Sequence, residues 1–235
     1  MGNLGRVGSP SARRTVTFDN ERLLKLATFF GSAALILTLF VAWHGSPLPG
    51  DLGAIRAVQD WTFARRFEGV VNALGRFEMQ LLVALVCLAL VAFGPRLNVH
   101  AGSSAERTVA AWSLIAALGL RFIASPLKSM AQGERPSSAY DLRITQHFPG
   151  YGFPSGHVLG DVVIFGTLAV VAPAIVGRTA GAAARVFCLA AIVLAGPARM
   201  TVGAHWPSDV AGGYLWGACA LCVAIFLGRR LSGSR

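Results

Sequence analysis

The sequence predicts an all-α integral membrane protein: a bundle of six transmembrane helices with an amphipathic interfacial helix between spans 1 and 2. Two observations carry this prediction. Of the 235 residues, 54% are hydrophobic and only 14% are charged, whereas soluble proteins carry about 25% charged residues. Apolar runs close to 20 residues long recur along the chain, and each can cross a hydrocarbon core of about 30 Å. A soluble helical protein would need far more polar helix faces.

The six spans are placed by the lengths of the apolar runs. Proline lacks an amide donor and disrupts a helix interior, so we expect Pro126 to end the third span and Pro197 the fifth. Composition predicts a loose cytoplasmic N-terminal segment at 1–22, one membrane domain at 23–230 and a tail at 231–235. The expected spans are residues 23–43, 79–94, 108–125, 156–176, 180–197 and 209–228.

The segment 51–78 differs from the spans on either side of it. Charged residues alternate there with apolar ones at helical spacing, and basic and acidic charges nearly balance. An amphipathic helix of this kind lies along a membrane surface with its apolar face buried at the headgroup level. We therefore expect an interfacial helix here.

The net charge is +10, a balance that can indicate nucleic-acid binding. The basic residues lie mostly in short segments between the apolar runs and form no basic amphipathic face, so no nucleic-acid partner is expected. With six spans both termini share one side, and that side holds the excess of lysine and arginine. The positive-inside rule then places the termini in the cytoplasm, which for a bacterial cell means a multi-pass protein of the cytoplasmic (inner) membrane.

Span parity brings the ends of several spans to the opposite, extracytoplasmic face. Three basic side chains, two histidines and a carboxylate gather there, together with the start of span 4 and with no metal-ligand signature. Taken singly, an arginine near a span end usually extends to the interface, and a lone histidine is usually structural. Their convergence favours a site. The candidate residues are Lys128, Arg135, Ser155, Gly156, His157, Arg199, His205 and Asp209.

These residue types suit phosphoryl chemistry. Cationic side chains can neutralise the equatorial phosphate oxygens, and the backbone amides at the start of a helix bind anions. Asp209 is four residues after His205 and can accept a hydrogen bond from one ring nitrogen, which leaves the other as a neutral nucleophile. His157, from another span, could protonate a departing alkoxide. His44, His100 and His147 lack such company and are interpreted as surface residues.

Three motifs carry a family resemblance. K-x6-RP at 128–136, PSGH at 154–157 and R-x5-H-x3-D at 199–209 resemble, in order and spacing, those of the type 2 phosphatidic acid phosphatase superfamily. That family includes membrane lipid phosphate phosphatases and bacterial polyprenyl diphosphate phosphatases. The third motif usually begins Ser-Arg, whereas this chain has Ala198 before Arg199, which removes a hydroxyl donor beside the phosphate.

The resemblance implies a role for each candidate residue. His205 would form a phosphohistidine, Asp209 would orient it, and His157 would be the general acid. No metal and no cofactor are implied. The residues implied to bind phosphate are Lys128, Arg135, Ser155, Gly156 and Arg199.

The expected activity is hydrolysis of a lipid phosphate or diphosphate of the phosphatidate, phosphatidylglycerol phosphate or undecaprenyl diphosphate class, with the membrane bilayer as the surroundings. A lipid phosphotransferase using the same site stays open, as does a non-catalytic anion-binding or transport protein. Vanadate-dependent haloperoxidases share the motifs but are soluble. The sequence does not name the lipid or the oligomeric state.

Two charged residues inside the spans need partners. Asp161 lies one helical turn deeper than His157 on the same face of span 4, and Arg121 lies near the end of span 3. A buried carboxylate in a membrane seeks a partner or a polar cavity. One expectation is that Asp161 and Arg121 contact each other. The other is that Arg121 extends outward, while Asp161 faces the cleft or bonds His157.

Overall fold

The computed structural model of the chain describes residues 19–97 and 102–233. Throughout these residues the backbone is helical or irregular, without a β-strand. Most of the predicted N-terminal segment and His100 lie outside the described residues, and the division at 1–22, 23–230 and 231–235 stays a prediction. The α-helices are α1 (Asn20–His44), α2 (Asp51–Asp60), α3 (Thr62–Leu74), α4 (Phe77–Phe93), α5 (Ser104–Leu120), α6 (Ala124–Ala131), α7 (Gly156–Val176), α8 (Arg178–Thr201) and α9 (Pro207–Leu231).

Six apolar helical stretches in the described ranges are long enough to cross a membrane, which confirms the predicted fold class. Short 3-10 helices extend two of them: η1 (Gly94–Leu97) follows α4, and η2 (Arg121–Ile123) joins α5 to α6; a third, η3 (Ser138–Tyr140), lies in a loop. The six spans are Asn20–His44, Phe77–Arg96, Ser104–Ala131, Gly156–Val176, Arg178–Thr201 and Pro207–Leu231.

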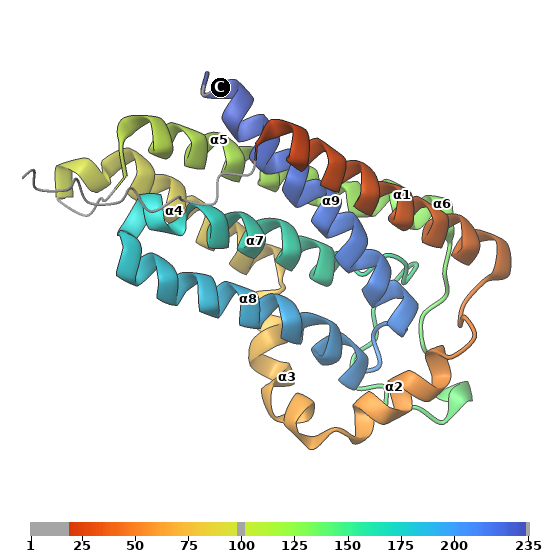
Figure 1. The fold of residues 1–235 in the computed structure, drawn as a ribbon. Coiled ribbons are helices and arrows are strands. Elements are labelled where there is room, and N and C mark those ends of the chain that lie inside the picture. The colour runs from red at the N-terminus through yellow and green to blue at the C-terminus, as the bar shows by residue number, and fades with distance from the viewer. Residues whose placement is uncertain (1–18, 98–101, 234–235) are drawn as a thin grey trace, which may run out of the picture.

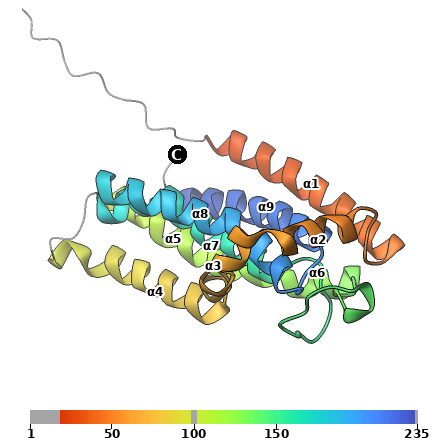
Figure 2. The ribbon, with the colours of Figure 1, turned by 90° about the horizontal axis from the view of Figure 1, so that it is seen from below.

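Helix α7 is the centre of the bundle. It packs against α8, α9, α5 and α4, and Figure 1 shows it with α8 on one side and α9 on the other. Within its most apolar stretch, 83% of the residues are buried, against 17–44% for the other spans. In Figure 2, α1 and α4 lie on opposite sides of the bundle, with α7 among the helices between them. Most of α7 is therefore surrounded by protein.

The sequence predicted that the third span ends at Pro126, and this prediction is wrong. The span continues through α6 to Ala131. Proline is tolerated there because it lies in the first turn of α6, where amide groups have no intrahelical partner. The 3-10 turn at Arg121–Ile123 separates α5 from α6 and so provides this new start. Lys128 is consequently a helical residue.

The fifth span likewise continues past Pro197 to Thr201. A proline inside a helix leaves the carbonyl four residues earlier without its donor, which here is the carbonyl of Val193. The hydroxyl of Tyr214 on α9 lies 3.2 Å from that carbonyl and 2.8 Å from the carbonyl of Ile192. A neighbouring helix therefore compensates for the proline, as often occurs in membrane spans.

The segment predicted as one interfacial helix consists of α2 and α3, which meet at Trp61. Both helices pack against α8 and cover one end of the bundle, as Figure 1 shows. Asp51, at the start of α2, is buried. Its carboxylate accepts hydrogen bonds from the amide and the hydroxyl of Ser208, at 2.9 and 2.7 Å. An aspartate far away in the sequence thereby caps the first turn of α9.

Candidate active site

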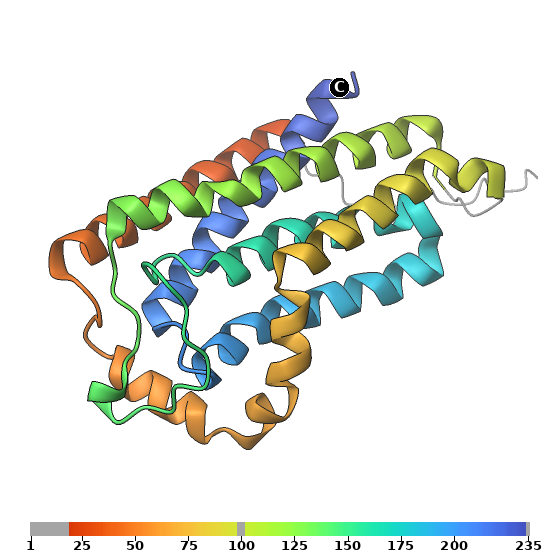
Figure 3. The same ribbon diagram turned by 180° about the vertical axis from the view of Figure 1, so that it is seen from behind.

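The loop between α6 and α7 crosses the end of the bundle, near α2, as Figure 3 shows. Backbone hydrogen bonds hold this loop in place. The amide of Gly152 donates to the carbonyl of Gly133 at 2.7 Å, and the amide of Ser155 donates to the carbonyl of Asp209 at 2.9 Å. The three sequence motifs meet here, at the ends of α6, α7, α8 and α9.

His205 precedes α9 and is almost fully buried. Its Nδ1 lies 3.2 Å from Oδ2 of Asp209, an oxygen that also accepts the Trp206 amide at 3.0 Å. Pro207 starts the helix and places Asp209 in its first turn. If Nδ1 donates to the carboxylate, Nε2 carries the lone pair. Nε2 lies 3.3 Å from a terminal nitrogen of Arg135.

The electrostatic surroundings keep His205 neutral. Burial is the larger cause, and the positive charges of Arg135, Arg199 and Lys128 add to it, so the pKa of His205 lies well below its ordinary value of 6.5. Desolvation disfavours the charged imidazole and nearby cations disfavour it further. A neutral imidazole is the form that can act as a nucleophile.

Lys128 and Arg135 are held by backbone carbonyls of the loop between α6 and α7 and of the segment between α8 and α9. The Lys128 ammonium donates to the carbonyls of Tyr151 and Gly152, each at 2.9 Å. Arg135 donates to the carbonyls of Gly150, Tyr151 and Ala204 at 3.0, 3.1 and 2.8 Å. Burial lowers the pKa of Arg135, and the nearby Asp209 opposes this change. Both cations are thus oriented beside His205 by the protein itself.

The start of α7 contributes donors with no protein partner. Ser155 is fully buried, and its hydroxyl has no hydrogen-bond partner in the part of the chain that the structure describes. It occupies the N-cap position of α7 but makes no capping bond through its side chain. Gly156 and His157 follow it in the first turn, where backbone amides are available to an anion. Unpaired buried hydroxyls are rare in folded proteins.

Arg199, at the end of α8, is 2% exposed. One terminal nitrogen donates to the side-chain oxygen of Asn72 at 2.9 Å, and the Asn72 amide donates to the carbonyl of Ala198 at 3.3 Å. The Nε of Arg199 has no partner among the described residues. The ring of Phe148 lies 4.6 Å from the Arg199 guanidinium and 5.5 Å from that of Arg135.

Sequence reasoning missed Asn72 and Phe148. Asn72 is one polar residue in the amphipathic helix α3, where polar residues are expected on the solvent side, and Phe148 is one aromatic residue in a loop. Neither belongs to a motif. The one available signal was that Asn72 stands between the apolar residues Val71 and Ala73.

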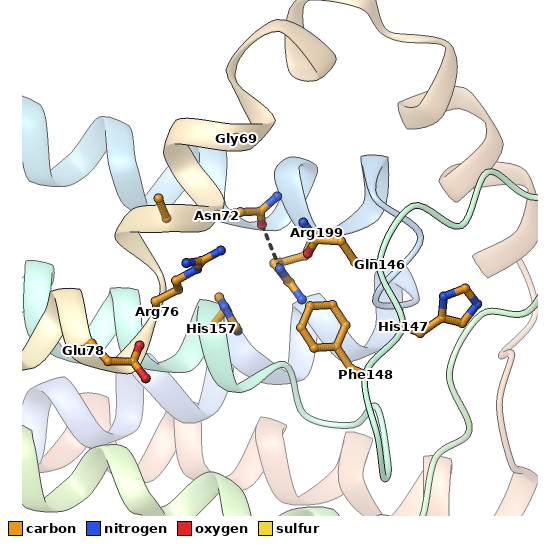
Figure 4. A pocket seen from close by; sticks show the side chains of 10 residues that line it. Gly69, Asn72, Arg76, Glu78, Gln146, His147, Phe148, His157 and Arg199 are labelled. Carbon is orange, nitrogen blue, oxygen red and sulfur yellow. Dashed lines mark hydrogen bonds between the residues drawn. The ribbon is translucent and has the colours of Figure 1, made fainter.

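A cavity of about 740 Å³ opens beside the site. Figure 4 shows His157 and Arg199 on its wall, with Phe148 beside them. His147, interpreted from sequence as a surface residue, is exposed but also lines this cavity. His44 is exposed as predicted. The lining residues are Gly69, Asn72, Ala73, Arg76, Glu78, Gln146, His147, Phe148, His157 and Arg199.

The expected contact between Asp161 and Arg121 is not direct. Gln80 lies between them, donating to Asp161 at 2.7 Å and accepting from Arg121 at 2.6 Å. A neutral amide therefore links the two charges. The prediction missed it because Gln80 is one polar residue near the start of a strongly apolar span.

Comparison with known proteins identifies the family. A model described as the PAP2 superfamily matches residues 110–231, more than half of the chain and all eight candidate residues. The chain belongs to the PAP2 superfamily. This confirms the resemblance inferred from the three motifs.

Among solved structures, the fold resembles a crystal structure described as the first transmembrane PAP2 type phosphatidylglycerolphosphate phosphatase from Bacillus subtilis. The TM-score is 0.68 at 18% sequence identity, covering 85% of this chain and 94% of the other. At this identity the likeness shows a common fold. No curated protein matches the sequence.

Ala198 occupies the position where the resemblance in the third motif implied a serine. Ala198 is buried, and its carbonyl accepts hydrogen bonds from Asn72 and from the hydroxyl of Thr201, at 3.3 and 3.0 Å. The backbone of this position therefore supports Asn72, the residue that contacts Arg199.

Proposed function

We propose that this PAP2 protein hydrolyses a lipid phosphate or diphosphate through a phosphohistidine on His205, at the extracytoplasmic face of the membrane. Membership in the superfamily supports a phosphatase activity, and the six apolar spans support a membrane substrate. The observation that carries the proposal is the position of His205, with Nδ1 against Asp209 and Nε2 against Arg135. The structural neighbour's described substrate, phosphatidylglycerol phosphate, is one member of the proposed class.

In the first step the lone pair on Nε2 of His205 attacks phosphorus and the bond to the lipid oxygen breaks. His157, which enters the step protonated, gives its proton to the departing oxygen, an alkoxide oxygen from a phosphate ester or a phosphate oxygen from a diphosphate. Asp209 accepts a hydrogen bond from Nδ1 and stabilises the positive charge that develops on the imidazole. The products are a phosphohistidine, neutral His157 and the leaving group, which is a lipid alcohol from a phosphate ester and a lipid monophosphate from a diphosphate.

In the second step a water molecule attacks phosphorus and the phosphorus–nitrogen bond breaks. His157 takes the proton that the water loses, which restores the acid for the next turnover. Inorganic phosphate leaves and the lone pair returns to Nε2. Each step requires only groups of this chain and water, and no step requires a metal ion.

The phosphate would bind among the three cations and the start of α7. Arg199 Nε and the Ser155 hydroxyl are buried donors without partners among the described residues, and a phosphate oxygen would satisfy each. Lys128 and Arg135 would neutralise charge that develops in the transition state. Gly156 has no side chain, so the backbone at this position could approach the phosphate closely.

The test uses the purified full-length protein and a panel of lipid phosphates and diphosphates, with inorganic phosphate as the readout. His205→Ala should abolish turnover, and Asp209→Asn should reduce it by roughly 10²–10⁴-fold. Radioactive phosphate trapped on the wild type should be acid-labile and absent from His205→Ala. Activity that persists in His205→Ala, or that requires Mg²⁺ after EDTA treatment, would refute the mechanism. Transfer of label to an added alcohol in preference to water would indicate the phosphotransferase.

A further inference from the structure

The large cavity lies on one side of the proposed reaction centre. Of the proposed catalytic and phosphate-binding residues, only His157 and Arg199 line it. His205 and Asp209 are not among the residues that line it, and His205 contacts Arg135. In an in-line displacement the nucleophile and the leaving group are on opposite sides of phosphorus. Because His157 is the proposed proton donor to the leaving group, the cavity is on the leaving-group side.

The cavity is too large for a single phosphate, and most of the residues that line it are polar or charged. Its volume of about 740 Å³ falls within the ~300–1,000 Å³ typical of pockets that enclose a whole small ligand. Asn72, Gln146 and His147 line it together with Arg76 and Glu78. A leaving group made only of hydrocarbon would cover these polar side chains without offering them hydrogen-bond partners, and burying polar groups in this way is unfavourable.

Arg76 is the cation of this cavity that the phosphate site does not use. It lies between α3 and α4 as the N-cap residue of α4, and Figure 4 shows its guanidinium directed into the cavity, towards the side of Asn72 and Arg199. Its side chain makes no hydrogen bond or ion pair within the described residues. It is also close enough to His157 to contribute to the positive potential there.

The one carboxylate in the lining does not cancel this charge. Glu78 lies two residues after Arg76, and the two side chains form no ion pair among the described residues. Figure 4 shows its carboxylate directed away from the guanidinium of Arg76. The wall between Arg76 and Arg199 is therefore positive, and it faces the place where the leaving group would lie.

We propose that this cavity is a leaving-group pocket in which Arg76 binds a second anionic phosphate of the substrate. The inference rests on the proposed function and narrows its substrate class to lipids with two phosphates. The phosphates are either joined directly, as in a lipid diphosphate, or separated by a short polar spacer, as in phosphatidylglycerol phosphate. Phosphatidate, whose leaving group is an uncharged diacylglycerol, would leave Arg76 without a partner.

The size of the effect follows from the exposure of Arg76. Arginine binds phosphate with paired, charge-assisted hydrogen bonds. Arg76 is exposed to solvent, and water screens its charge. We therefore expect a preference of roughly tenfold, which is small for a charge-assisted pair.

The test compares two matched pairs of substrates: farnesyl diphosphate with farnesyl phosphate, and phosphatidylglycerol phosphate with phosphatidate of the same acyl chains. Arg76→Gln should lower kcat/KM for the two-phosphate member of a pair about tenfold and leave the one-phosphate member within twofold. Arg65→Gln is the matched control, since Arg65 is exposed on α3 but is not among the residues that line the cavity. It should change neither member of a pair.

A loss limited to the farnesyl pair would indicate directly joined phosphates, and a loss limited to the phosphatidyl pair would indicate the spaced arrangement. The proposal would be overturned if Arg76→Gln lowered kcat/KM equally for the two members of each pair, or if it lowered kcat/KM for none of the substrates. Affinities are measured as well, in the His205→Ala protein, so that the pocket is tested without turnover. If the wild type releases phosphate from no substrate, the proposed function fails. A selective loss of two-phosphate binding in Arg76→Gln would then still support the pocket, and no selective loss would refute it.

Discussion

Gln80 donates a hydrogen bond of 2.7 Å to Oδ1 of Asp161, and its own oxygen accepts one of 2.6 Å from Nε of Arg121. The arrangement ties α4, η2 and α7 together one helical turn below the candidate general acid. Gln80 is fully buried and Asp161 is 2% exposed. A Cβ at position 160 would lie 2.5 Å from the Gln80 oxygen, so Gly160 provides the space for this amide.

Gln80→Leu keeps the volume and removes both hydrogen bonds. Asp161 loses the donor to its carboxylate, and Arg121 is left with the Phe77 ring at 4.6 Å. We expect this substitution to lower the free energy of unfolding by about 1–3 kcal/mol. Asp161→Asn should cost less than Asp161→Ala, because asparagine keeps an acceptor for Gln80. The measurement is thermal unfolding in detergent.

The coupling within this network is tested by a double-mutant cycle. Gln80→Leu combined with Asp161→Ala should cost less than the sum of the two single changes, since they remove the same bond. Leu82→Ala, at an exposed position of the same helix, is the control and should add independently. Strict additivity of Gln80 and Asp161 would contradict the network.

Asn72 should matter to activity through Arg199. Asn72→Ala removes the acceptor that holds one nitrogen of Arg199 at 2.9 Å, so the guanidinium loses a fixed orientation. We expect kcat/KM for phosphate release to fall about tenfold, against roughly 10²–10³-fold for Arg199→Ala, which removes the cation itself. The double variant should be no worse than Arg199→Ala. A further loss in the double variant would show that Asn72 acts independently.

The eight candidate residues could be found from sequence because they form spaced motifs at span ends, and span parity brings those ends to one face. The surrounding support could not be found in this way. Asn72, Gln80 and Phe148 are single residues whose partners lie 127, 81 and 51 positions away, respectively. Their roles depend on helix packing, which no local pattern encodes.

The ends of helices were also hard to predict from local sequence patterns. Pro197 was expected to end a span, which is correct for an isolated helix because the carbonyl of Val193 loses its donor. In the folded protein the hydroxyl of Tyr214 lies 3.2 Å from the carbonyl of Val193, and the helix continues to Thr201. A tertiary contact thus overrides the local rule.

The pKa of His205 lies well below 6.5 in the folded protein, which makes stability depend on pH. Below pH ~6.5 the unfolded chain binds a proton at this histidine and the folded protein does not. The contribution of His205 to the free energy of unfolding is therefore fully present above its pKa in the unfolded chain. This contribution is lost as pH falls towards its pKa in the folded protein. The free energy of unfolding should fall by about 1.4 kcal/mol per pH unit from this group alone.

The check is a series of unfolding temperatures between pH 7.5 and pH 5. His205→Gln removes the titrating group, so its unfolding temperature should vary less steeply with pH than that of the wild type. His44→Gln, at an exposed histidine, is the matched control for the removal of one imidazole. An equally steep slope in His205→Gln would contradict the prediction.

The last prediction concerns the side of the membrane. Helix α9 runs 25 residues from Pro207, at the candidate site, to Leu231, a length of about 37 Å. Its two ends therefore belong to opposite membrane faces. Arg229 and Arg230 lie at the far end, and the positive-inside rule assigns that end to the cytoplasm.

Introduced cysteines test this orientation in a protein from which Cys87, Cys188, Cys219 and Cys222 have been removed. The probe positions are Ala139, exposed in η3 on the site side, and Ser232, just past the end of α9. An impermeant thiol reagent should label Ala139→Cys in intact cells and Ser232→Cys only after permeabilisation. The cysteine-free protein sets the background. Labelling of Ser232→Cys alone in intact cells would place the site in the cytoplasm, because the far end of α9 would then face outward.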